Sequence, residues 1–470
     1  VTVSNSGAWA ISGDLDIGQG GTGVLNIADF GIVAVADGHG PVTLGAQGTL
    51  NIGTGGSLGL LIAETVSGVS GAVVNYNYNL FNPSLPYNPV LTGDLAVNKL
   101  GSGYLSFDQQ NTYTGRTTVN GGTLDLDFTD VTTDIISRSS ALTLGGGTLN
   151  LYSQASGSSQ TLNGLTTTAG TSSLIYLSSD VTLDLGALTS AGSGSALNFD
   201  LYEGGADGAT VGTGIVLLSG QTAGSVINPG FTVTDSTGFG LATVNDLNQI
   251  IRLTSTDLLP DSGAIAGTDY LIDNNSGGNL DPGSSSLEIT ASQTARSITV
   301  DSTQSTGLLT LDAGAVLSSD VWNFGGEYDY EITGSDSGAG ITTATTGGML
   351  QINNFNYGGI VTISAPILDN GGSGLRIAGP DSLTILTGTD TYTGETIINN
   401  GTLFINGDHT AATGEIIVQS SAELAGIGQL GSNIHVLNGG ILTPGTINDL
   451  GTLTGTTATF DTNSIFHVLG

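Results

Sequence analysis

The sequence predicts an all-β protein built as an elongated parallel β-helix, also called a β-solenoid. Short runs of alternating apolar and polar residues recur along the chain, which is typical of strands with one buried face. Glycine accounts for 76 of the 470 residues and clusters between these runs, where it supplies tight corners. One longer unit occurs twice. Strands this short bury enough surface only by stacking on further coils, so these three observations together predict a solenoid.

The repeated unit covers residues 101–128 and returns at residues 375–406. In both copies, alternating runs flank a Thr-Tyr-Thr-Gly loop, and a Gly-Thr-Leu strand start follows. The first loop begins at Thr112 and the second at Thr391, which is 279 residues later (391 − 112). Asn120 and Asn399 are separated by the same number of residues. The second copy has one extra residue in the loop before Asp390. We therefore expect both copies to form equivalent coils.

The first coils repeat on a shorter period. Residues 23–27 read GVLNI, and GTLNI begins 25 residues later, at residue 48 (48 − 23). Leu and Ile then point inward while Asn and Thr point outward, as the pleat of a strand requires. With about 22 to 25 residues per coil and about 4.8 Å between strands, a regular shaft is on the order of 90 to 100 Å long.

Changes in rhythm divide the chain into five segments. Regular coils are expected wherever the alternation is clear. A projecting loop is expected where three prolines cluster with Asn and Tyr. A less regular insertion is expected where large apolar residues and acidic loops replace the alternation. The loop is an irregular connection or an exposed aromatic contact patch. The expected segments are N-terminal coils 1–72, the projecting loop 73–90, coils 91–202 with the first repeat, the less regular segment 203–285, and coils 286–470 with the second repeat and closing coils.

Composition excludes several classes of function. Six Lys and Arg stand against 40 Asp and Glu, which gives a net charge of −34. Such a chain repels phosphate backbones and anionic membranes, so we expect no nucleic-acid partner and no membrane insertion. No run of about 18 apolar residues encodes a membrane-spanning helix. The charge favours solubility and weak cation binding.

Covalent cross-links are also excluded. The chain has no cysteine, which removes disulfides, thiol nucleophiles and Cys-based metal sites. Lys99 is the one lysine, so a series of Lys–Asn isopeptide bonds cannot form. Stability must come from stacked hydrogen bonds and apolar ladders. The chain starts at Val1 and ends after an unfinished strand at residues 464–469, so we expect it to be part of a longer protein.

The loop sequence NTYTGRTTVNGGTL, residues 111–124, resembles the autotransporter-associated β-strand repeat of bacterial surface proteins. The second copy departs from it at Asp390 and at residues 397–398, which are both Ile. Residues 425–445 are similar to the closing coils of such proteins. The resemblance implies a right-handed parallel β-helix that is secreted or held at the bacterial cell surface. Members of the family act as adhesins, self-associating factors or carriers.

No catalytic, cofactor-binding or metal-binding residue is predicted. The four histidines His39, His409, His435 and His467 lie far apart in sequence and form no metal-spacing motif. His39 is expected at a corner, and His435 and His467 in strand ladders. No Gly-x-Ser-x-Gly elbow lies between a strand and a helix, and the glycine-rich residues 20–23 have no following helix or lysine, so they read as a corner. A triad assembled from remote residues stays open.

Two weaker patterns point toward ligands. Glu327, Asp329 and Asp336 lie near Trp322 and Tyr328, and carboxylates beside aromatic rings are a common sugar-binding combination. An alternative is a plain shaft surface. Acidic residues also gather between 261 and 281, where weak Ca²⁺ binding stays open. The strict Gly-Gly-x-Gly-x-Asp repeat of calcium-loaded β-rolls is missing, so no cofactor is predicted.

Three functions are compatible with these features of the sequence. The first is a non-enzymatic extracellular structural protein whose strand-like ends pair with further copies, giving end-to-end fibres. The second is an adhesin or autotransporter passenger stalk, whose loops at 73–90 and 257–282 contact host or neighbouring cells. An enzyme is the weakest candidate. The expected partners are therefore the chain itself or cell-surface glycans and proteins.

Overall fold

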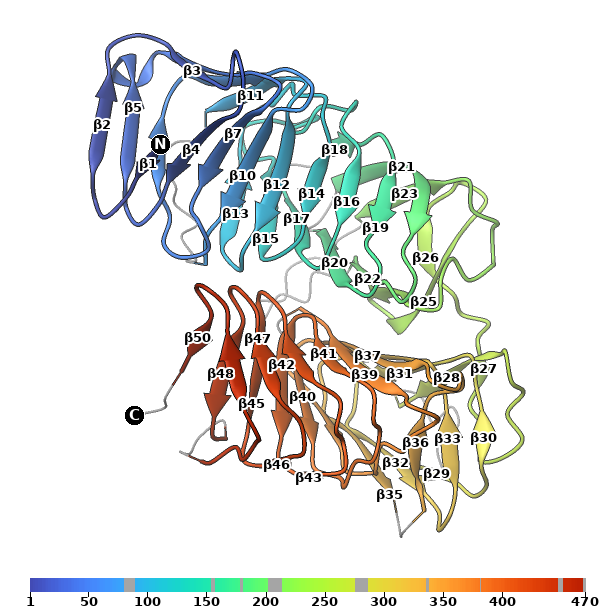
Figure 1. The fold of residues 1–470 in the computed structure, drawn as a ribbon. Coiled ribbons are helices and arrows are strands. Elements are labelled where there is room, and N and C mark those ends of the chain that lie inside the picture. The colour runs from blue at the N-terminus through green and yellow to red at the C-terminus, as the bar shows by residue number, and fades with distance from the viewer. Residues whose placement is uncertain are drawn as a thin grey trace.

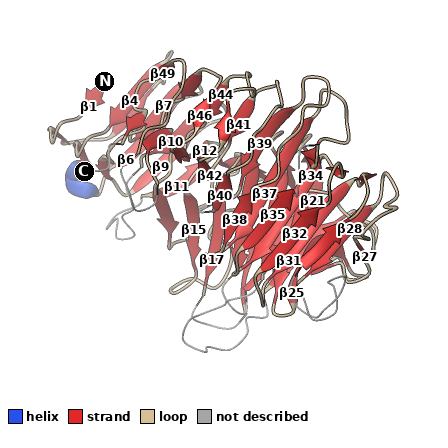
Figure 2. Cartoon of the chain, turned by 90° about the horizontal axis from the view of Figure 1, so that it is seen from below, coloured by secondary structure: helices blue, strands red, loops and turns tan. Residues whose placement is uncertain are grey.

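The computed structural model describes residues 1–79, 89–153, 157–177, 181–201, 214–274, 286–334, 338–380, 382–446 and 451–467. Nearly all of the regular structure in these ranges is β-strand (Figures 1 and 2). The described part contains a single 3₁₀ helix, η1 (Ala36–Gly38), at a corner of the second coil. The predicted fold class, a parallel β-solenoid, is confirmed.

The first half of the chain forms an arm of stacked coils, which we call the first arm. Its longest sheet joins eleven strands, all paired in parallel: β1 (Thr2–Val3), β4 (Gly23–Ile27), β7 (Gly48–Ile52), β10 (Val73–Asn77), β12 (Ala96–Leu100), β14 (Thr117–Val119), β16 (Leu142–Leu144), β18 (Ser158–Thr161), β19 (Leu165–Thr167), β21 (Val181–Ala191) and β23 (Ile215–Ser219). An eight-stranded sheet forms a second face: β13 (Tyr104–Phe107), β15 (Thr123–Asp127), β17 (Thr148–Tyr152), β20 (Ser172–Leu177), β22 (Ala196–Asp200), β24 (Phe231–Asp235), β25 (Gly238–Val244) and β26 (Ile250–Arg252). Two short sheets complete the first coils: β2 (Ala8–Ile11), β5 (Ile32–Val35) and β8 (Leu60–Ile62), and β3 (Leu15–Ile17), β6 (Pro41–Leu44), β9 (Thr65–Gly68) and β11 (Val90–Gly93).

The second half forms a second arm with the same construction. Its ten-stranded sheet contains β27 (Asp257–Leu258), β28 (Asp269–Asp273), β31 (Ser297–Ser302), β34 (Val321–Gly326), β37 (Met349–Asn356), β39 (Gly374–Ala378), β41 (Thr396–Ile398), β44 (Ile416–Val418), β47 (Ile434–Val436) and β49 (Ala458–Phe460). Its nine-stranded sheet contains β29 (Ser286–Ile289), β32 (Gly307–Leu311), β35 (Tyr330–Gly334), β38 (Ile360–Ile363), β40 (Leu383–Leu386), β42 (Gly401–Ile405), β45 (Ala422–Gly426), β48 (Ile441–Pro444) and β50 (Ile465–Phe466). Short sheets of β30 (Gln293–Thr294), β33 (Val316–Ser318) and β36 (Gly340–Thr342), and of β43 (Asp408–His409) and β46 (Gln429–Leu430), form the remaining face.

Period-two alternation explains the interior of each arm. In β4, Leu25 and Ile27 are buried while Asn26 between them is half-buried on the outside. The outward asparagines of successive coils are hydrogen-bonded into a ladder. The Nδ2 of Asn51 donates to Asn26, that of Asn75 to Asn51, and that of Asn98 to Asn75, at 2.7 to 2.8 Å. Such amide ladders lock the coil register, because a one-residue slip would bury the asparagines.

The two arms lie side by side and run in opposite directions (Figure 1). The chain reverses after β24, where β24–β25 and β25–β26 pair antiparallel, unlike the parallel ladders elsewhere in the named strands. Each arm has its own apolar core, one ending at Ile250 and the other starting at Leu259. The sequence patterns did not predict this reversal, since repeat periodicity carries no information about contacts between distant coils.

The arms meet corner to corner through polar groups. The Nδ2 of Asn400, between β41 and β42, donates to the carbonyl oxygens of Gly146 (3.0 Å) and Ser172 (2.9 Å) in the first arm. Farther along, Asn463 donates to the carbonyl oxygen of Thr54 at 3.0 Å. Close to the chain reversal, apolar contacts join the polar ones. The amide of the buried Phe239 donates to the Asp301 carboxylate at 2.9 Å, and its ring centre lies 6.5 Å from that of Phe355.

Two expected segments look different in the structure. Residues 73–77 form β10, an in-register strand of the main ladder, because Val74 and Tyr76 continue the inward alternation. Residues 80–88 of the expected projecting loop lie outside the described residues. The segment 203–285 holds the antiparallel strands and the reversal, while residues 202–213 and 275–285 also lie outside the described part. The segment boundaries stay predictions.

Among the described residues, no helix is both long and apolar enough to cross a membrane.

Candidate functional site

The aromatic and acidic residues proposed to bind sugar are only partly brought together. Trp322 is fully buried in β34 and stacks on Phe324, with ring centres 5.9 Å apart and planes 10° from parallel. It faces the core and cannot contact a ligand outside. Glu327, Tyr328 and Asp329 lie exposed at the corner between β34 and β35. Asp336 lies outside the described residues.

The structure adds Tyr357 to this corner. Its side chain is 82% exposed and that of Tyr328 is 43% exposed. The two residues occupy corners of adjacent coils, joined by hydrogen bonds from the Tyr357 amide to the Gly326 carbonyl oxygen (2.7 Å) and from Asn356 Nδ2 to the Tyr328 carbonyl oxygen (2.6 Å). We call Glu327, Tyr328, Asp329 and Tyr357 the aromatic corner. Exposed tyrosines beside carboxylates present apolar ring faces and hydrogen-bond acceptors to a partner.

Tyr357 escaped prediction from the sequence because it lies about thirty residues from Tyr328, roughly one coil away. The available signal was an Asn-Tyr-Gly-Gly turn at residues 356–359, which ends an alternating strand and leaves an aromatic residue at the turn.

Three of the four histidines lie at the surface or near it. His39 is exposed at the end of η1, which agrees with a corner position. His435 lies in β47, with Nε2 3.1 Å from the Asp461 carboxylate. His467 is exposed next to β50. Within the described ranges, no three His, Cys, Asp or Glu side chains gather as metal ligands would.

His409 is different, because it is buried against a carboxylate. His409 is 2% exposed and Asp390 is 1% exposed, and Nδ1 of the histidine lies 3.1 Å from Oδ2 of the aspartate. The contact lacks hydrogen-bond geometry, so neither ring nitrogen has a hydrogen-bond partner among the residues described. The other Asp390 oxygen accepts the Ile367 amide at 2.7 Å.

Burial dominates the protonation of this pair. Desolvation raises the pKa of Asp390 to about 7 and lowers the pKa of His409 to about 4. The amide of Ile367 acts against the first shift, and the charge of Asp408 acts against the second. The pair is buried between the second copy of the repeat and the coil that follows it, so it is a poor candidate for chemistry on an outside substrate.

Lys99, the one lysine, is also fully buried. Its Nζ donates to the carbonyl oxygens of Leu100 (2.7 Å), Gly101 (2.9 Å) and Gly121 (3.1 Å), and it lies 5.6 Å from the ring centre of Tyr78. Burial lowers the pKa of Lys99 to about 7. All three ammonium hydrogens have carbonyl acceptors, so the side chain closes the corner of the first repeat.

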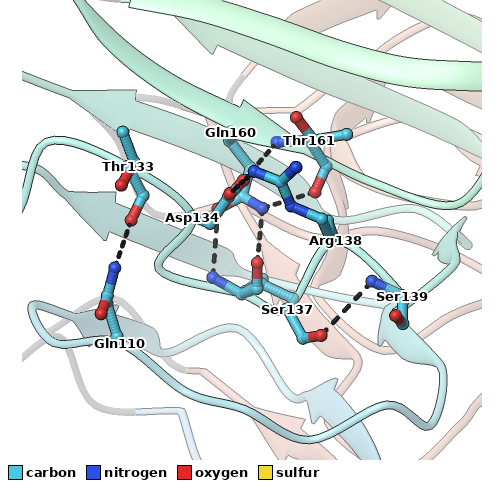
Figure 3. A network of polar contacts seen from close by, with 9 residues as sticks. Gln110, Thr133, Asp134, Ser137, Arg138, Ser139, Gln160 and Thr161 are labelled. Atoms are coloured by element: carbon cyan, nitrogen blue, oxygen red, sulfur yellow. Dashed lines mark hydrogen bonds and ion pairs between the residues drawn. The ribbon is translucent and has the colours of Figure 1, made fainter.

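A polar network holds the loop that follows the first repeat (Figure 3). Gln160 accepts the Ile136 amide at 3.0 Å and donates back to the Ile136 carbonyl oxygen at 2.7 Å. Asp134 accepts the Thr161 amide at 2.9 Å and forms an ion pair with Arg138. These groups saturate backbone donors and acceptors of the loop, which indicates a structural role.

The acidic segment proposed for weak Ca²⁺ binding is partly described. Asp269 is neutralised by an ion pair with Arg296 and accepts the Ser297 hydroxyl at 2.6 Å. Residues 275–285 lie outside the described part of the chain, so the proposal of a calcium site at 261–281 stays a prediction.

Comparison with known proteins supports the resemblance drawn from the motifs. A family model described as passenger-associated-transport-repeat matches residues 97–126 and 379–404, which contain the cores of both repeat copies. The chain is 29% identical over 481 aligned positions to the adhesin BmaC autotransporter of Brucella suis biovar 1 (strain 1330). The alignment covers 94% of this chain but 12% of the relative, so the chain corresponds to a small part of such a protein. The chain therefore carries two passenger-type repeats within a β-solenoid.

Proposed function

We propose that this chain is a stalk segment of an adhesin-type passenger, presented outside the cell or at its surface. The observation that carries the proposal is the match along 94% of the chain to an autotransporter adhesin, combined with two passenger-type repeats, one in each arm. A solenoid suits this role because each coil is supported by its neighbours, and its corners can carry exposed residues without weakening the core.

The proposed role is non-catalytic. Both the repeat family and the solenoid favour a structural protein. The most unusual titratable groups, Asp390 and His409, are buried inside the second arm, where no substrate reaches them. The net charge of −34 supports solubility outside the cell.

The aromatic corner is the proposed contact with a surface glycan or protein of another cell. Tyr328 and Tyr357 expose more ring surface than a stalk needs for its own packing. Their carboxylate neighbours Glu327 and Asp329 favour neutral or basic partners over acidic ones.

The test is adhesion of beads coated with the purified chain to cultured host cells and to bacterial cells. A Tyr328→Ala/Tyr357→Ala double variant is expected to lose most of the adhesion, while Tyr152→Ala, which removes an exposed tyrosine from the first arm, is expected to keep it. If beads that carry the parent chain adhere no better than uncoated beads, the proposal that the stalk contacts other cells is contradicted.

End-to-end fibre assembly, the first hypothesis from the sequence, remains a prediction. The first and last described strands, β1 and β50, lie at the same end of the molecule (Figure 1). Light scattering and electron microscopy over a range of concentrations, with and without calcium, test the assembly. Filaments would support it, and single particles under all conditions would exclude it.

A further inference from the structure

A cavity of about 260 Å³ lies between the two arms, where the corners of both repeats face each other. Each arm contributes polar side chains to its wall. Those of the first arm are Ser102, Thr123 and Thr148, and those of the second arm are Asn400, Thr402, Ser421 and Glu423. The cavity therefore exists only when the arms are docked.

The cavity wall has a specific chemistry. Five hydroxyls, one amide and one carboxylate line it, and none of the lining residues in the described chain is Lys or Arg. The Glu423 carboxylate accepts the hydroxyl of Thr402 at 3.2 Å and the hydroxyl of Thr443. These two hydroxyls fix the orientation of the carboxylate. Anionic ligands are disfavoured because nothing in the wall would balance their charge.

One group in the wall still needs a partner. The hydroxyl oxygen of Ser421 is buried and has no hydrogen-bond partner among the residues that the structure describes. Buried polar groups are normally paired, because a lost hydrogen bond costs about 1 to 3 kcal/mol. The atom has almost no accessible surface, so a ligand hydroxyl in the cavity becomes its partner once the Ser421 side chain rotates.

Apolar groups interrupt the polar wall. Pro380, Ala422 and Ile441 add carbon surface beside the hydroxyls and Glu423. A sugar ring has the matching pattern, with hydroxyl groups at its rim and C–H groups on its faces. The volume is slightly below the roughly 300 to 1,000 Å³ of sites for drug-sized molecules, which suits a single sugar unit better than a chain.

We propose that this cavity binds one neutral sugar unit, with Glu423 and the hydroxyls of the wall as its main hydrogen-bonding groups. A bound sugar contacts both arms, so it stabilises their docked arrangement, because the site is lost when the arms separate. This site is separate from the aromatic corner, and its existence does not depend on the adhesive role.

Saturation-transfer NMR and calorimetry on the whole chain test the proposal, with D-glucose, D-galactose, D-mannose and N-acetylglucosamine as probes. At least one of them is expected to bind with a Kd on the order of 1 mM, as the small size of the ligand dictates. N-acetylneuraminic acid, a sugar that carries a carboxylate, is expected not to bind.

Two variants localise the binding. Glu423→Gln is expected to weaken it by about tenfold, the effect of losing a hydrogen bond to a charged group. Glu331→Gln is the matched control, since Glu331 also accepts a hydroxyl, from Ser364 at 2.8 Å, but lies exposed on strand β35. Ser102→Phe places a ring in the cavity from an exposed position and is expected to abolish binding while the melting temperature stays unchanged.

The proposal is overturned if no neutral sugar binds at 100-fold the expected Kd, on the order of 100 mM. It is also overturned if folded Glu423→Gln and Ser102→Phe variants bind as the parent does. If the aromatic-corner variant loses cell adhesion but still binds sugar, the result bears on the proposed stalk role and leaves the cavity proposal unchanged.

Discussion

The residue that precedes the Tyr-containing loop is Asn111 in the first copy of the repeat and Asp390 in the second. Asn111 is neutral and fully hydrogen-bonded: its Oδ1 accepts the Leu91 amide at 2.9 Å, and its Nδ2 donates to the Gln109 carbonyl oxygen at 3.0 Å. Asp390 keeps the equivalent amide bond, from Ile367, but has no Nδ2 to donate. The same coil position therefore ends in an amide in one arm and in a carboxylate in the other.

The next coil compensates for this difference. The residue that lies beside Asn111 one coil later is the apolar Ile136, and the residue in the equivalent place beside Asp390 is His409. The imidazole places a polar ring nitrogen 3.1 Å from the carboxylate, whereas an isoleucine offers only carbon atoms. The comparison shows that a stacked coil tolerates a titratable residue in its core when the neighbouring coil supplies a partner.

The largest expected effect concerns what the two copies share. Tyr113 and Tyr392 are both buried, and each hydroxyl lies 2.7 Å from the hydroxyl of a threonine four residues later. Replacing either tyrosine with alanine is expected to lower the free energy of unfolding of its own arm by about 3 to 5 kcal/mol, since a large cavity forms. Hydrogen exchange followed by mass spectrometry reads each arm separately.

Because the arms have separate cores, Tyr113→Ala is expected to leave exchange in the second arm nearly unchanged, and Tyr392→Ala in the first. The exposed Tyr152→Ala serves as the control for loss of a tyrosine, with an effect within about 0.5 kcal/mol. Equal acceleration of exchange in both arms by one variant would mean that the two arms unfold as one unit.

The second prediction converts the second copy toward the first with Asp390→Asn. Folding raises the pKa of Asp390 from 3.8 to about 7, so its stabilising contribution is complete below pH 3.8 and is lost as the pH rises through 7. Folding lowers the pKa of His409 from 6.5 to about 4, so its contribution is present above pH 6.5 and is lost as the pH falls through 4. Between these limits the two slopes oppose each other in the parent chain.

In the Asp390→Asn variant, only His409 of the pair still makes the free energy of unfolding depend on pH in this range. The second arm is then expected to lose on the order of 3 kcal/mol, relative to the parent chain, as the pH falls from 6.5 to 4. The His409→Leu variant is expected to change in the opposite direction and gain stability over the same range. Urea unfolding of all three chains at several pH values measures these differences, since the other carboxylates titrate equally in each. Parallel curves for the parent and Asp390→Asn would refute the coupling.

The third prediction concerns Lys99, whose position by register corresponds to Ile377 in the second copy. Lys99→Met fills the space but leaves the carbonyl oxygens of Leu100, Gly101 and Gly121 without their ammonium donor. The first arm is expected to lose about 1 to 3 kcal/mol, measured as a shift of its urea midpoint. Ile377→Met is the matched control. A stabilised Lys99→Met variant would indicate that the cost of burying the ammonium exceeds the value of its hydrogen bonds.

The strands and the repeat were predictable because they depend on local patterns. Alternation at residues such as Leu25, Asn26 and Ile27 determines which side chains enter the core, whatever the rest of the chain does. The His409–Asp390 contact was not predictable, since pairing the two residues requires the register between coils. The motif offered one clue, the replacement of asparagine by Asp390.

The reversal of the solenoid and the cavity between the arms depend on still longer-range contacts. Asn400 reaches the carbonyl oxygen of Gly146, a residue 254 positions earlier in the chain. No short-range pattern marks an asparagine at a corner as an inter-arm donor, because most corner asparagines only bind their own backbone. The sequence also left open whether Trp322 belongs to a sugar-binding surface, and the structure places it in the core, since an aromatic residue near carboxylates in sequence can still face inward.

The smallest expected effect tests how the two copies share the junction. Asn400 of the second copy corresponds in sequence to Gly121 of the first, and a Cβ at Gly121 would lie 3.2 Å from the hydroxyl oxygen of Ser421 in the other arm. The corner at Asn400 therefore forms hydrogen bonds to the other arm, while the corner at Gly121 has no side chain and leaves space for Ser421. Asn400→Gly makes the two corners alike and removes the hydrogen bonds to Gly146 and Ser172. We expect a loss of about 1 to 2 kcal/mol in arm docking, from two hydrogen bonds.

Docking is best measured by the distance between two spin labels, on Thr22→Cys in the first arm and Thr462→Cys in the second, because the chain has no other cysteine to label. In Asn400→Gly, the distance distribution is expected to broaden toward longer values while the strand content of each arm stays the same. Asn399→Gly, at the same corner, controls for the flexibility of the added glycine. If both variants broaden the distribution equally, the stiffness of the corner and not the Asn400 hydrogen bonds holds the arms together. If only Asn400→Gly does so, the hydrogen bonds of Asn400, which the first copy lacks at the equivalent Gly121, hold the two arms together.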